Sequence, residues 1–441
     1  MANISPEKIA QRVLDACLAG EEWRPADVDV LVDSDSDALF TIVAEGLADR
    51  FDPRLCDEYV NIFCQAIARA DDRFKPDQLR VRYRHVSQAW PYRPPLTPKE
   101  RATRRILAVE QKALRSLRTG GAAYLVPGIE PIAPREPQIE ADNPKQIILL
   151  SRVTLGADIA VTSVVAQALR ARFPDANLVL AGGSKSAEFL GLPSMAIDYP
   201  RNGGLRERLA AMEPFAELDE RTLVVDPDSR LTQLGIYPVV HDDRYCFFDS
   251  RSVEDPGSLS ELARAWCAAV FEVSIPGPKI VVGDPPFPVA KPAITVNLGV
   301  GGNENKRVGA QFERDLLMQL SQRARTVIVD KGSGREEAAR AEAAAAGLKN
   351  VQFWEGSFAG FAALIARSNL YVGYDSAGQH AAAALSIPLV SVFAGAVNDR
   401  FFERWRPDGH VIRVDGGSQE SAFLRARTAV RSAMRLQGLP T

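Results

Sequence analysis

The segment from residue 370 to residue 393 places polar side chains and small residues in an order that suits anion binding. It reads Leu-Tyr-Val-Gly-Tyr-Asp-Ser-Ala-Gly-Gln-His-Ala-Ala-Ala-Ala-Leu-Ser-Ile-Pro-Leu-Val-Ser-Val-Phe, which predicts a strand, a turn, a helix and a second strand. A helix that begins on Ser376, Ala377 and Gly378 presents free backbone N–H groups and a positive dipole end to a phosphate or diphosphate. Ser376 and His380 could add side-chain donors. The alternative is a tight turn in which Asp375 or Ser376 only caps the helix, and the residues favour neither interpretation.

A second loop, residues 297–307, reads Asn-Leu-Gly-Val-Gly-Gly-Asn-Glu-Asn-Lys-Arg. Gly301 and Gly302 allow the backbone to approach a ligand closely, which favours contact between Lys306 and a phosphate; the alternative is a solvated loop lysine. The chain has only 11 lysines and four histidines, so a lysine or histidine in such a loop is worth attention.

Several other chemical signatures are incomplete. The glycine-rich loops 299–304 and 332–337 both end on Glu where a dinucleotide fingerprint needs Gly or Ala. No Gly-Lys-Ser/Thr, His-Glu-x-x-His or complete Gly-x-Ser-x-Gly sequence occurs. The acidic stretch 33–44 lacks both the turn glycine and the final glutamate of a calcium loop. The five cysteines form no Cys-x-x-Cys pair, which is typical of reduced thiols in a cytosolic protein.

The order of predicted elements indicates three regions in the 441 residues. Helical spacing of apolar residues predominates at first, and then short apolar strands alternate with helices, which favours parallel sheets covered on both faces. We therefore predict two Rossmann-like α/β domains facing across a cleft, preceded by an α-helical N-terminal domain. Strands are expected at 146–150, 178–180, 222–225, 279–282, 293–297, 326–330, 351–354, 369–373 and 388–393. The predicted boundaries are 1–125 (helical region), 126–144 (Pro-rich linker), 145–288 and 289–415 (the two α/β domains) and 416–441 (a C-terminal helix crossing back to the first).

The charge is unevenly distributed along the chain. The net charge is −3, yet the stretch Arg73–Arg118 holds 13 basic residues against three acidic ones. This stretch could meet a peripheral membrane surface or a protein partner, and the alternative is a solvated helical face. No nucleic acid is expected as a partner. The sequence shows neither a secretory signal nor a run of 18 apolar residues, so we expect a cytoplasmic protein, with a location at the periphery of the inner membrane as a further option.

The segment around Ser376 resembles the Asp-Thr/Ser-Gly-x-x-His-x-Ala-Ala-Ala-Leu-x-x-Pro motif of the heptosyltransferase-like glycosyltransferases of family 9, which have the GT-B fold. Asp375, Ser376, His380 and Pro388 keep the motif's spacing, whereas Ala377 replaces a glycine that follows one place later. Residues 147–159 and 166–176 are similar to the family's opening strand, Gly-Asp loop and Phe-Pro-Asp-Ala helix end. Ala157 separates Gly156 from Asp158, which are adjacent in the family.

The resemblance implies roles for particular residues. Asp158 corresponds to the family's proposed general base; from the residues alone, a helix cap is the simpler interpretation. The donor diphosphate or nucleotide would be bound by groups in three loops: Lys306, Arg307, Gly301, Gly302, Asp375, Ser376, Ala377, Gly378, His380, Gly332 and Gly334. For the acceptor side we predict Gly156 together with Asp228, Arg230 and Gln233, which follow a predicted strand and could equally form a turn.

The resulting expectation is an inverting glycosyltransferase that moves a sugar, with heptose as one option, from a nucleotide-diphosphate sugar to a glycan, lipid-linked or protein acceptor. No metal and no cofactor are expected, since the donor is a substrate and the family is generally metal-independent. Two alternatives stay open. One is a nucleotide-sugar epimerase or hydrolase on the same scaffold, and the other is a non-catalytic nucleotide-sugar or glycan binding protein.

Overall fold

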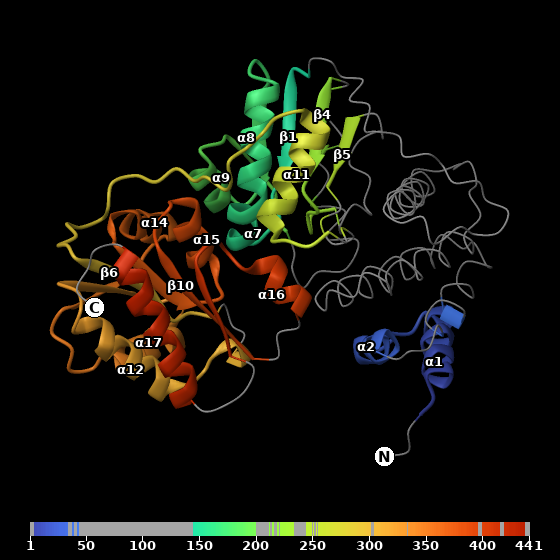
Figure 1. Cartoon of the computed structure of the whole chain (residues 1–441). Helices are drawn as coiled ribbons and strands as arrows, with labels where there is room; N and C mark the ends of the chain where they lie inside the picture. Colours follow the sequence, from blue (N-terminus) through green and yellow to red (C-terminus); the bar gives the residue numbers. More distant parts are fainter. Residues whose placement is uncertain are drawn as a thin grey trace. The chain divides into compact units, whose positions relative to one another are not determined.

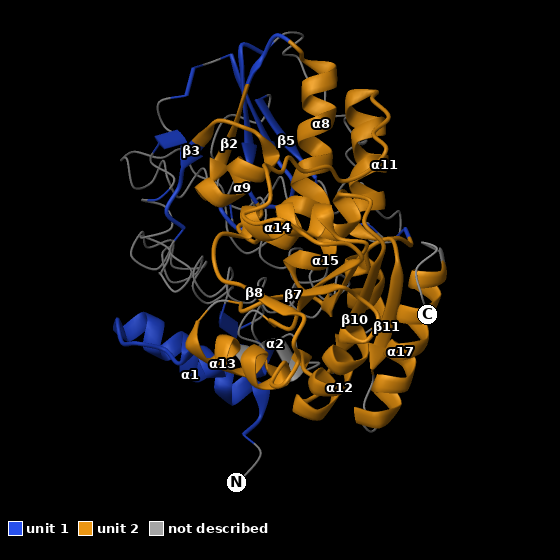
Figure 2. Cartoon of the chain, turned by 90° about the vertical axis from the view of Figure 1, so that its left-hand side faces the viewer, with its two compact units in different colours: residues 1–151, 175–177, 195–255 blue, residues 152–174, 178–194, 256–441 orange. Residues whose placement is uncertain are grey.

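The computed structural model shows two α/β sheets and a pair of N-terminal helices (Figure 1). The chain divides into two compact units (Figure 2), unit 1 with residues 1–151, 175–177 and 195–255 and unit 2 with residues 152–174, 178–194 and 256–441. The structure describes residues 4–33, 38, 42–43, 144–199, 211, 214–215, 218–219, 221–232, 244–248, 250, 253, 255–300, 304–332, 334–395, 399–414 and 419–436.

The smaller sheet has five strands in the order β3-β2-β1-β4-β5. The β1–β4 and β4–β5 pairs are parallel, with Gln146 beside Thr222 and Val224 beside Tyr245. Strands β1 and β4 are almost entirely buried, as expected for apolar runs in a sheet covered on both faces. The strands are β1 Gln146–Leu150, β2 Asn177–Gly182, β3 Ser194–Ala196, β4 Thr222–Asp226 and β5 Tyr245–Phe247.

The larger sheet lies in unit 2 and has six parallel strands in the order β11-β10-β9-β6-β7-β8. The strand order reverses between β6 and β9, and ligands of open α/β sheets bind outside the carboxyl ends of strands at such a switch point. The residues at this edge, Asn297 at the end of β6 and Asp375 directly after β9, are therefore placed to meet a ligand. The strands are β6 Ala293–Asn297, β7 Thr326–Asp330, β8 Val351–Trp354, β9 Leu370–Tyr374, β10 Leu389–Ala394 and β11 His410–Val414.

Helices cover the sheets, and the last one, α17, packs on α12 and on β9 to β11 of the larger sheet (Figure 1). Its residues Ala426, Val430 and Met434 enter that sheet's hydrophobic core. The helices of unit 2 are α7 Leu155–Ala157, α8 Ser163–Arg172, α9 Ser184–Leu190, α11 Leu259–Phe271, α12 Ala310–Ser321, α13 Arg335–Ala344, α14 Phe358–Arg367, α15 Ala377–Ala384, α16 Asp399–Trp405 and α17 Gln419–Leu436, with a π-helix at Asp158–Thr162 and a 3-10 turn at Glu304–Lys306.

At the N-terminus, α1 (Pro6–Ala19) and α2 (Pro25–Asp33) pack together. Helix α1 buries Ile9, Val13 and Cys17, which have the helical spacing seen in the sequence, and Gly20 ends it in the left-handed conformation. The rest of the predicted helical region lies almost wholly outside the described residues, as does the basic stretch Arg73–Arg118.

The predicted fold class of two parallel-sheet α/β domains is confirmed, and one predicted strand is wrong. Residues 279–282 form no sheet ladder; the N–H of Val281 donates one hydrogen bond to the carbonyl of Phe189, at 2.7 Å, and its side chain is 57% exposed. An apolar run of this length cannot by itself distinguish a strand from an extended connection. The domain boundaries stay predictions, including the return of the C-terminal helix to the first α/β domain.

Candidate functional site

The first turn of α15 follows the buried strand β9 at the switch point of the larger sheet. Ser376 is the N-cap residue with extended backbone, and its hydroxyl is buried without a hydrogen-bond partner among the described residues. Gly378 is required by packing, because a Cβ atom at this position would lie 2.3 Å from the Tyr371 hydroxyl oxygen. At position 377 the chain has alanine, whose Cβ is accommodated. The contact with Tyr371 therefore explains why glycine stands at position 378 in this chain.

Lys306 reaches this turn from the 3-10 turn that follows β6. Its ammonium lies 2.8 Å from Asp375 Oδ2, and its side chain is 27% exposed to solvent. It also lies 5.7 Å from the ring centre of Phe401, within range of a cation–π interaction. The structure thus brings Lys306 together with Asp375 at the start of α15, although 69 residues separate them in the sequence.

His380 is a neutral, buried member of the same cluster. Burial lowers the pKa of His380 to about 4; the nearby Asp375 opposes this shift and Lys306 adds to it. The Gln379 amide nitrogen lies 3.2 Å from His380 Nε2, and because an amide nitrogen only donates, Nε2 is the accepting nitrogen. Gln379 also donates to Asp375 Oδ1, at 2.6 Å, and accepts from the Ser391 hydroxyl. His380 is therefore held as an uncharged imidazole at neutral pH.

The loop after β1 lies against the same turn. A Cβ atom on Gly156 would lie 3.1 Å from His380 Cδ2, which is tighter than most side-chain contacts, and 3.4 Å from the Cα atom of Ala377, which is an ordinary van der Waals contact. Gly156, which the sequence assigns to the acceptor side, therefore contacts two residues that it assigns to the donor. A close backbone approach of this kind is a physical reason for glycine at this position.

Asp158 has a different environment from the other predicted residues. Its side chain is fully buried at the start of the π-helix Asp158–Thr162. Oδ1 accepts from the Arg152 backbone N–H and the Thr162 hydroxyl, both at 2.7 Å, and Oδ2 accepts from the Ser186 hydroxyl at 2.6 Å. A π-helix turn holds about one more residue than an α-helix turn. The π-helix therefore accommodates the extra residue Ala157 between Gly156 and Asp158.

Arg307 points away from the cluster around Lys306. Its side chain is only 5% exposed and contacts Glu304 at 2.7 Å, the buried Glu313 at 3.3 Å and Glu337 at 3.6 Å. It also donates to the Leu298 carbonyl at 2.6 Å. Burial raises the pKa of Glu313, and the Arg307 charge opposes that shift. These contacts hold the loop that carries Lys306 and occupy the Arg307 guanidinium. Binding of the nucleotide-sugar donor by Arg307 stays a prediction.

Glycines 332 and 334 lie between β7 and α13, both with left-handed φ angles, and a Cβ on Gly332 would meet a Glu337 oxygen. The sequence reasoning did not single out the acid that precedes them. Asp330 accepts from Asn297 Nδ2 at 2.7 Å and from the Gly332 N–H at 3.2 Å, and burial raises the pKa of Asp330 to about 6, with Glu337 adding to the shift. An acid at the carboxyl end of a buried strand was the available signal.

The predicted acceptor residues after β4 form a buried turn in unit 1. Asp226 accepts from the Ser229 N–H at 2.6 Å, and Asp228 is 1% exposed, has φ +68° and accepts from the Ser250 hydroxyl at 2.6 Å. Asp228 is thus engaged in the turn, and Arg230 beside it is half-buried. Gln233, Gly301 and Gly302 lie outside the described residues.

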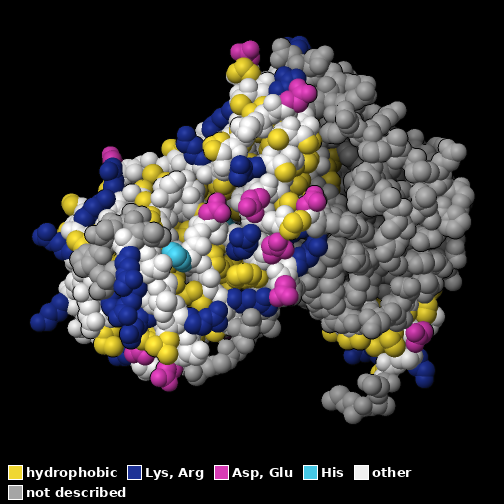
Figure 3. Space-filling view, in the orientation of Figure 1, with side chains coloured by type: hydrophobic (Ala, Val, Ile, Leu, Met, Phe, Trp, Pro, Cys, Tyr) yellow, Lys and Arg dark blue, Asp and Glu magenta, His cyan; other side chains and the backbone are white. Residues whose placement is uncertain are grey.

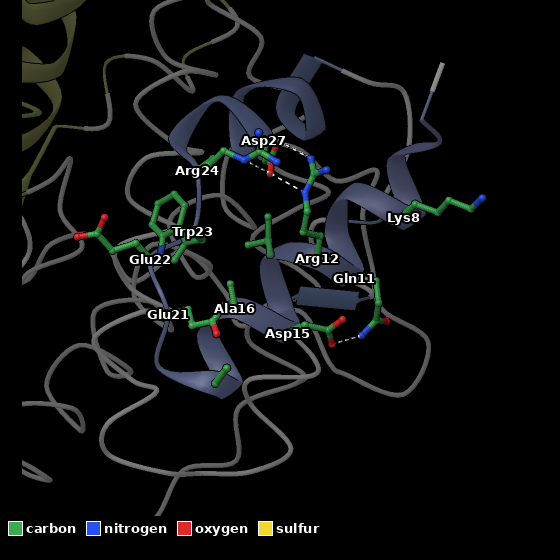
Figure 4. Close-up of a pocket in the computed structure, with 12 residues that line it drawn as sticks. Lys8, Gln11, Arg12, Asp15, Ala16, Glu21, Glu22, Trp23, Arg24 and Asp27 are labelled. Atoms are coloured by element: carbon green, nitrogen blue, oxygen red, sulfur yellow. Dashed lines mark hydrogen bonds and ion pairs between the residues drawn. The ribbon is translucent and has the colours of Figure 1, made fainter. Parts of the chain in front are cut away.

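Of two pockets in the described part of the chain, one includes a predicted site residue and the other includes none. A small pocket in unit 2 is lined by His380 and Ala383 of α15 together with Ser258, Ser260, Arg404 and Arg406. A larger one lies along α1 and α2 in unit 1, where Arg12 pairs with Asp27 at 2.7 Å (Figure 4). The second pocket contains none of the predicted site residues.

No group of three or more His, Cys, Asp and Glu residues in the described ranges could hold a metal ion. None of the helices that the structure describes is long and apolar enough to cross a membrane. Figure 3 shows basic and acidic side chains distributed over the visible face of the described chain.

Comparison with known proteins gives one family match. Residues 227–425 match the model described as Glycosyltransferase family 9 (heptosyltransferase). No curated protein matches the chain.

Similar solved structures include a family 9 glycosyl transferase from Veillonella parvula, at 15% identity and TM-score 0.49, covering 66% of this chain and 99% of that one. The E. coli heptosyltransferase WaaC with ADP has 16% identity and TM-score 0.47, with coverages of 66% and 99%. The iron-containing dodecameric glycosyltransferase TibC from enterotoxigenic E. coli has 12% identity and TM-score 0.40, with coverages of 67% and 77%.

Proposed function

We propose, from the premise that residues 227–425 are a glycosyltransferase family 9 domain, that this chain transfers a sugar from a nucleotide-diphosphate sugar to an acceptor hydroxyl. Heptose is the first sugar to test, because the matched family is described by heptosyl transfer. A glycan, a lipid-linked sugar or a protein could supply the hydroxyl.

The observation that carries the proposal is the pairing of Lys306 with Asp375 at the start of α15. When the bond between the sugar and the diphosphate breaks, negative charge grows on the leaving diphosphate. Cations and N–H dipoles fixed in place before the reaction stabilise that charge best. Lys306 and the free N–H groups of the first α15 turn are such groups, and the donor would take the place of Asp375 on the ammonium.

We propose that the transfer is direct and inverts the configuration of the sugar, with no metal. The acceptor oxygen would attack C1 on the face opposite the diphosphate. The positive groups around Ser376, in place of a divalent ion, would stabilise the negative charge on the leaving diphosphate. Chelation tests whether transfer needs a metal. The rate of transfer should be unchanged in EDTA. Loss of activity in EDTA, with recovery when a metal is added back, would show that the chain uses a metal.

The reaction also needs a group that accepts the proton of the acceptor hydroxyl. The sequence predicts Asp158 for this role, and the role stays a prediction. The carboxylate could reach an acceptor only if the loop 152–158 opened, because three donors occupy its oxygens and its side chain has no exposed surface.

A panel of ADP-, UDP-, GDP-, dTDP- and CMP-sugars tests the function, with thermal unfolding as the first readout. A ligand that binds only the folded state at about 100 times its Kd stabilises it by about 2.7 kcal/mol. At least one nucleotide sugar should raise the melting temperature, and the free sugar should not. No stabilisation by any of the five would remove the proposal.

Product analysis with the stabilising donor separates the alternatives. Release of nucleotide that depends on an acceptor supports glycosyl transfer. Turnover of the donor with no acceptor present indicates a hydrolase or epimerase, and binding without any turnover indicates a binding protein.

A further inference from the structure

The hydroxyl of Tyr371 lies beneath the first turn of α15. Tyr371 belongs to β9, and its side chain points to the face of the sheet opposite that of Val372, which lies in the core shared with α12 and α17. The Tyr371 side chain has no exposed surface. A Cβ atom would lie 2.3 Å from its hydroxyl oxygen if placed on Gly378, and 2.5 Å if placed on Gly373. The hydroxyl is therefore enclosed between β9 and the start of α15.

Two glycines make the space for this hydroxyl. Neither Gly373 nor Gly378 has a positive φ angle, so the backbone does not require glycine at either position. Gly373 is two residues beyond Tyr371 in the same strand, and the tyrosine ring passes over it on the same face of the sheet. The hydroxyl thus extends toward the carboxyl end of β9, where Asp375 and Ser376 follow.

Neither the Tyr371 hydroxyl nor the nearby Ser376 hydroxyl has a hydrogen-bond partner among the described residues, although both oxygens are buried. Buried polar groups are nearly always paired, and an unpaired one destabilises the fold. Phenylalanine at position 371 would fill the same space without that cost. A tyrosine at this position therefore indicates a partner that a ligand brings.

The electrostatic surroundings keep Tyr371 protonated. Burial raises the pKa of Tyr371, the Ser376 hydroxyl opposes the rise, and the carboxylates of Asp330 and Asp375 add to it. The phenol is consequently a hydrogen-bond donor at neutral pH. The influence of Ser376 also shows that the two hydroxyls are close neighbours, although they form no hydrogen bond with each other in this arrangement.

An anion at the start of α15 would give both hydroxyls a partner. Ser376 is the N-cap residue, so its oxygen lies beside the free N–H groups of the first helical turn. Lys306 supplies a cation to the same turn through its contact with Asp375. A serine hydroxyl has one proton and two lone pairs, so Ser376 can accept from Tyr371 and donate to a phosphate oxygen at the same time.

We propose that Tyr371 is a positioning residue for the diphosphate of the nucleotide-sugar donor. Its hydroxyl donates to Ser376 Oγ, and the Ser376 hydroxyl donates to a phosphate oxygen. A chain of two hydroxyls that ends on an anion polarises each bond, so Tyr371 strengthens the contact that Ser376 makes. The inference rests on the proposed function, because the donor supplies the phosphate, and Tyr371 lies outside the family motif that begins at Asp375.

Tyr371→Phe tests the proposal, because it removes the hydroxyl and keeps the ring. Titration calorimetry on the full chain measures the Kd of inorganic pyrophosphate and of the nucleotide sugar that stabilises the wild type most. We expect Tyr371→Phe to raise the Kd by about three- to tenfold, the range for one net hydrogen bond between neutral groups. Ser376→Ala, which loses a bond to a charged acceptor, should raise it by about 10- to 100-fold.

A double-mutant cycle shows whether Tyr371 acts through Ser376. In the Ser376→Ala background, Tyr371→Phe should raise the Kd no further, because the serine oxygen that the phenol contacts is already gone. An equal further rise in that background would overturn the proposal, as would an unchanged Kd in Tyr371→Phe alone.

Thermal unfolding without ligand separates positioning from a structural role. Tyr371→Phe should melt at or above the temperature of the wild type, because it removes a buried hydroxyl that has no partner. The matched control is Tyr374→Phe on the opposite face of β9. The Tyr374 hydroxyl accepts from the Val308 N–H at 3.2 Å and donates to Glu313 at 3.1 Å, so its loss should lower the melting temperature. A lower melting temperature in both variants, with unchanged Kd in Tyr371→Phe, would assign the Tyr371 hydroxyl to structure alone.

The two probes separate this inference from the proposed function. If the wild type binds a nucleotide sugar and Tyr371→Phe binds it equally well, the inference fails and the function stands. If the wild type binds pyrophosphate and no nucleotide sugar, the function fails and the Kd of pyrophosphate decides the role of Tyr371. A wild type that binds neither probe overturns both.

Discussion

Two aspartates of unit 2 lie beyond the carboxyl ends of buried parallel strands and differ in their partners and in their access to solvent. Asp375 directly follows β9 and precedes α15, whereas Asp158, after β1 and α7, begins the π-helix Asp158–Thr162. Asp375 pairs with the cation of Lys306, whose side chain keeps contact with solvent. Asp158 accepts from neutral donors and has no exposed surface.

The difference shows why an aspartate after a strand is a weak indicator of function. A carboxylate that neutralises a partly exposed lysine can be displaced by a stronger anion, because the lysine is available from the solvent side. A buried carboxylate that accepts several hydrogen bonds within the protein contributes to structure, and its removal leaves buried donors without partners. The predictions below test this contrast, from the largest expected effect to the smallest.

Replacing Lys306 with Met should have the largest effect on activity. The substitution removes the cation beside the start of α15 and keeps a side chain of similar length. We expect kcat/KM for transfer to fall by about 10²–10³-fold, the range seen when one preorganised stabilising group is lost. Steady-state kinetics measure it.

The matched control is Lys349→Met, the same change of charge at an exposed lysine after α13. Equal losses in the two variants would mean that Lys306 acts only through the net charge of the protein.

The stability of the fold should depend on pH through His380. Burial lowers the pKa of His380 to about 4 in the folded chain, while in the unfolded chain it is near its ordinary value of 6.5. Between these values the unfolded state binds more protons, so the contribution of His380 to stability is complete above pH 6.5 and is lost as the pH falls toward 4. The loss is roughly 3 kcal/mol.

Asp330 changes stability in the opposite sense, because burial raises its pKa from 3.8 to about 6. Denaturant unfolding of Asp330→Asn should therefore show the full fall in the free energy of unfolding between pH 6.5 and 4. Adding His380→Gln to Asp330→Asn should remove that fall. If the double variant and Asp330→Asn have the same pH dependence, His380 is not the group responsible.

Gly378→Ala should destabilise the turn of α15 that Lys306 approaches. A Cβ would lie 2.3 Å from the hydroxyl of Tyr371, which is fully buried and cannot move aside easily. Overpacking of this kind costs typically about 1–3 kcal/mol. Gly277→Ala, where a Cβ meets nothing within 4 Å, is the control in the same unfolding experiment. Equal stabilities would show that Tyr371 relaxes without cost.

Gly156→Ala should have the smallest effect on stability and report most directly on the contact between the two loops. The added Cβ would lie 3.1 Å from His380 Cδ2, so the ring must move by a few tenths of an ångström. We expect a loss under about 1 kcal/mol, together with a change in the His380 ring signals by NMR. Gly283→Ala, with open space around it, should leave these signals unchanged, and unchanged signals in Gly156→Ala would rule out the contact.

The fold was predictable because its signals are local. Apolar runs such as 293–297 and 326–330 became strands with the predicted bounds, and the helix predicted in the region 416–441 is α17, Gln419–Leu436. The segment 279–282, which was wrongly predicted as a strand, is also rich in β-branched residues but forms no ladder with a neighbouring strand. Composition indicates that a segment can be a strand, and pairing depends on the rest of the chain.

The candidate site was predictable in part. The sequence identified Ser376 and His380 by their place at a helix start, and Lys306 by its scarcity and its glycine-rich loop. It could not distinguish Lys306 from Arg307, since the direction of a side chain in a loop depends on the elements around it. The place of Asp330 at the carboxyl end of a predicted strand was the only sign of its altered environment, and burial, which raises its pKa, is set by the tertiary structure.

By itself the sequence determined most of the α/β elements, the helix start at Ser376 and the few cations near it, because local spacing and residue type control these features. The tertiary structure alone decided which charges are available. It turned Lys306 toward Asp375, enclosed Arg307 among Glu304, Glu313 and Glu337, and buried Asp158 beneath three donors. Burial and pairing are properties of residues far apart in the chain, and they set the free energy of each charge.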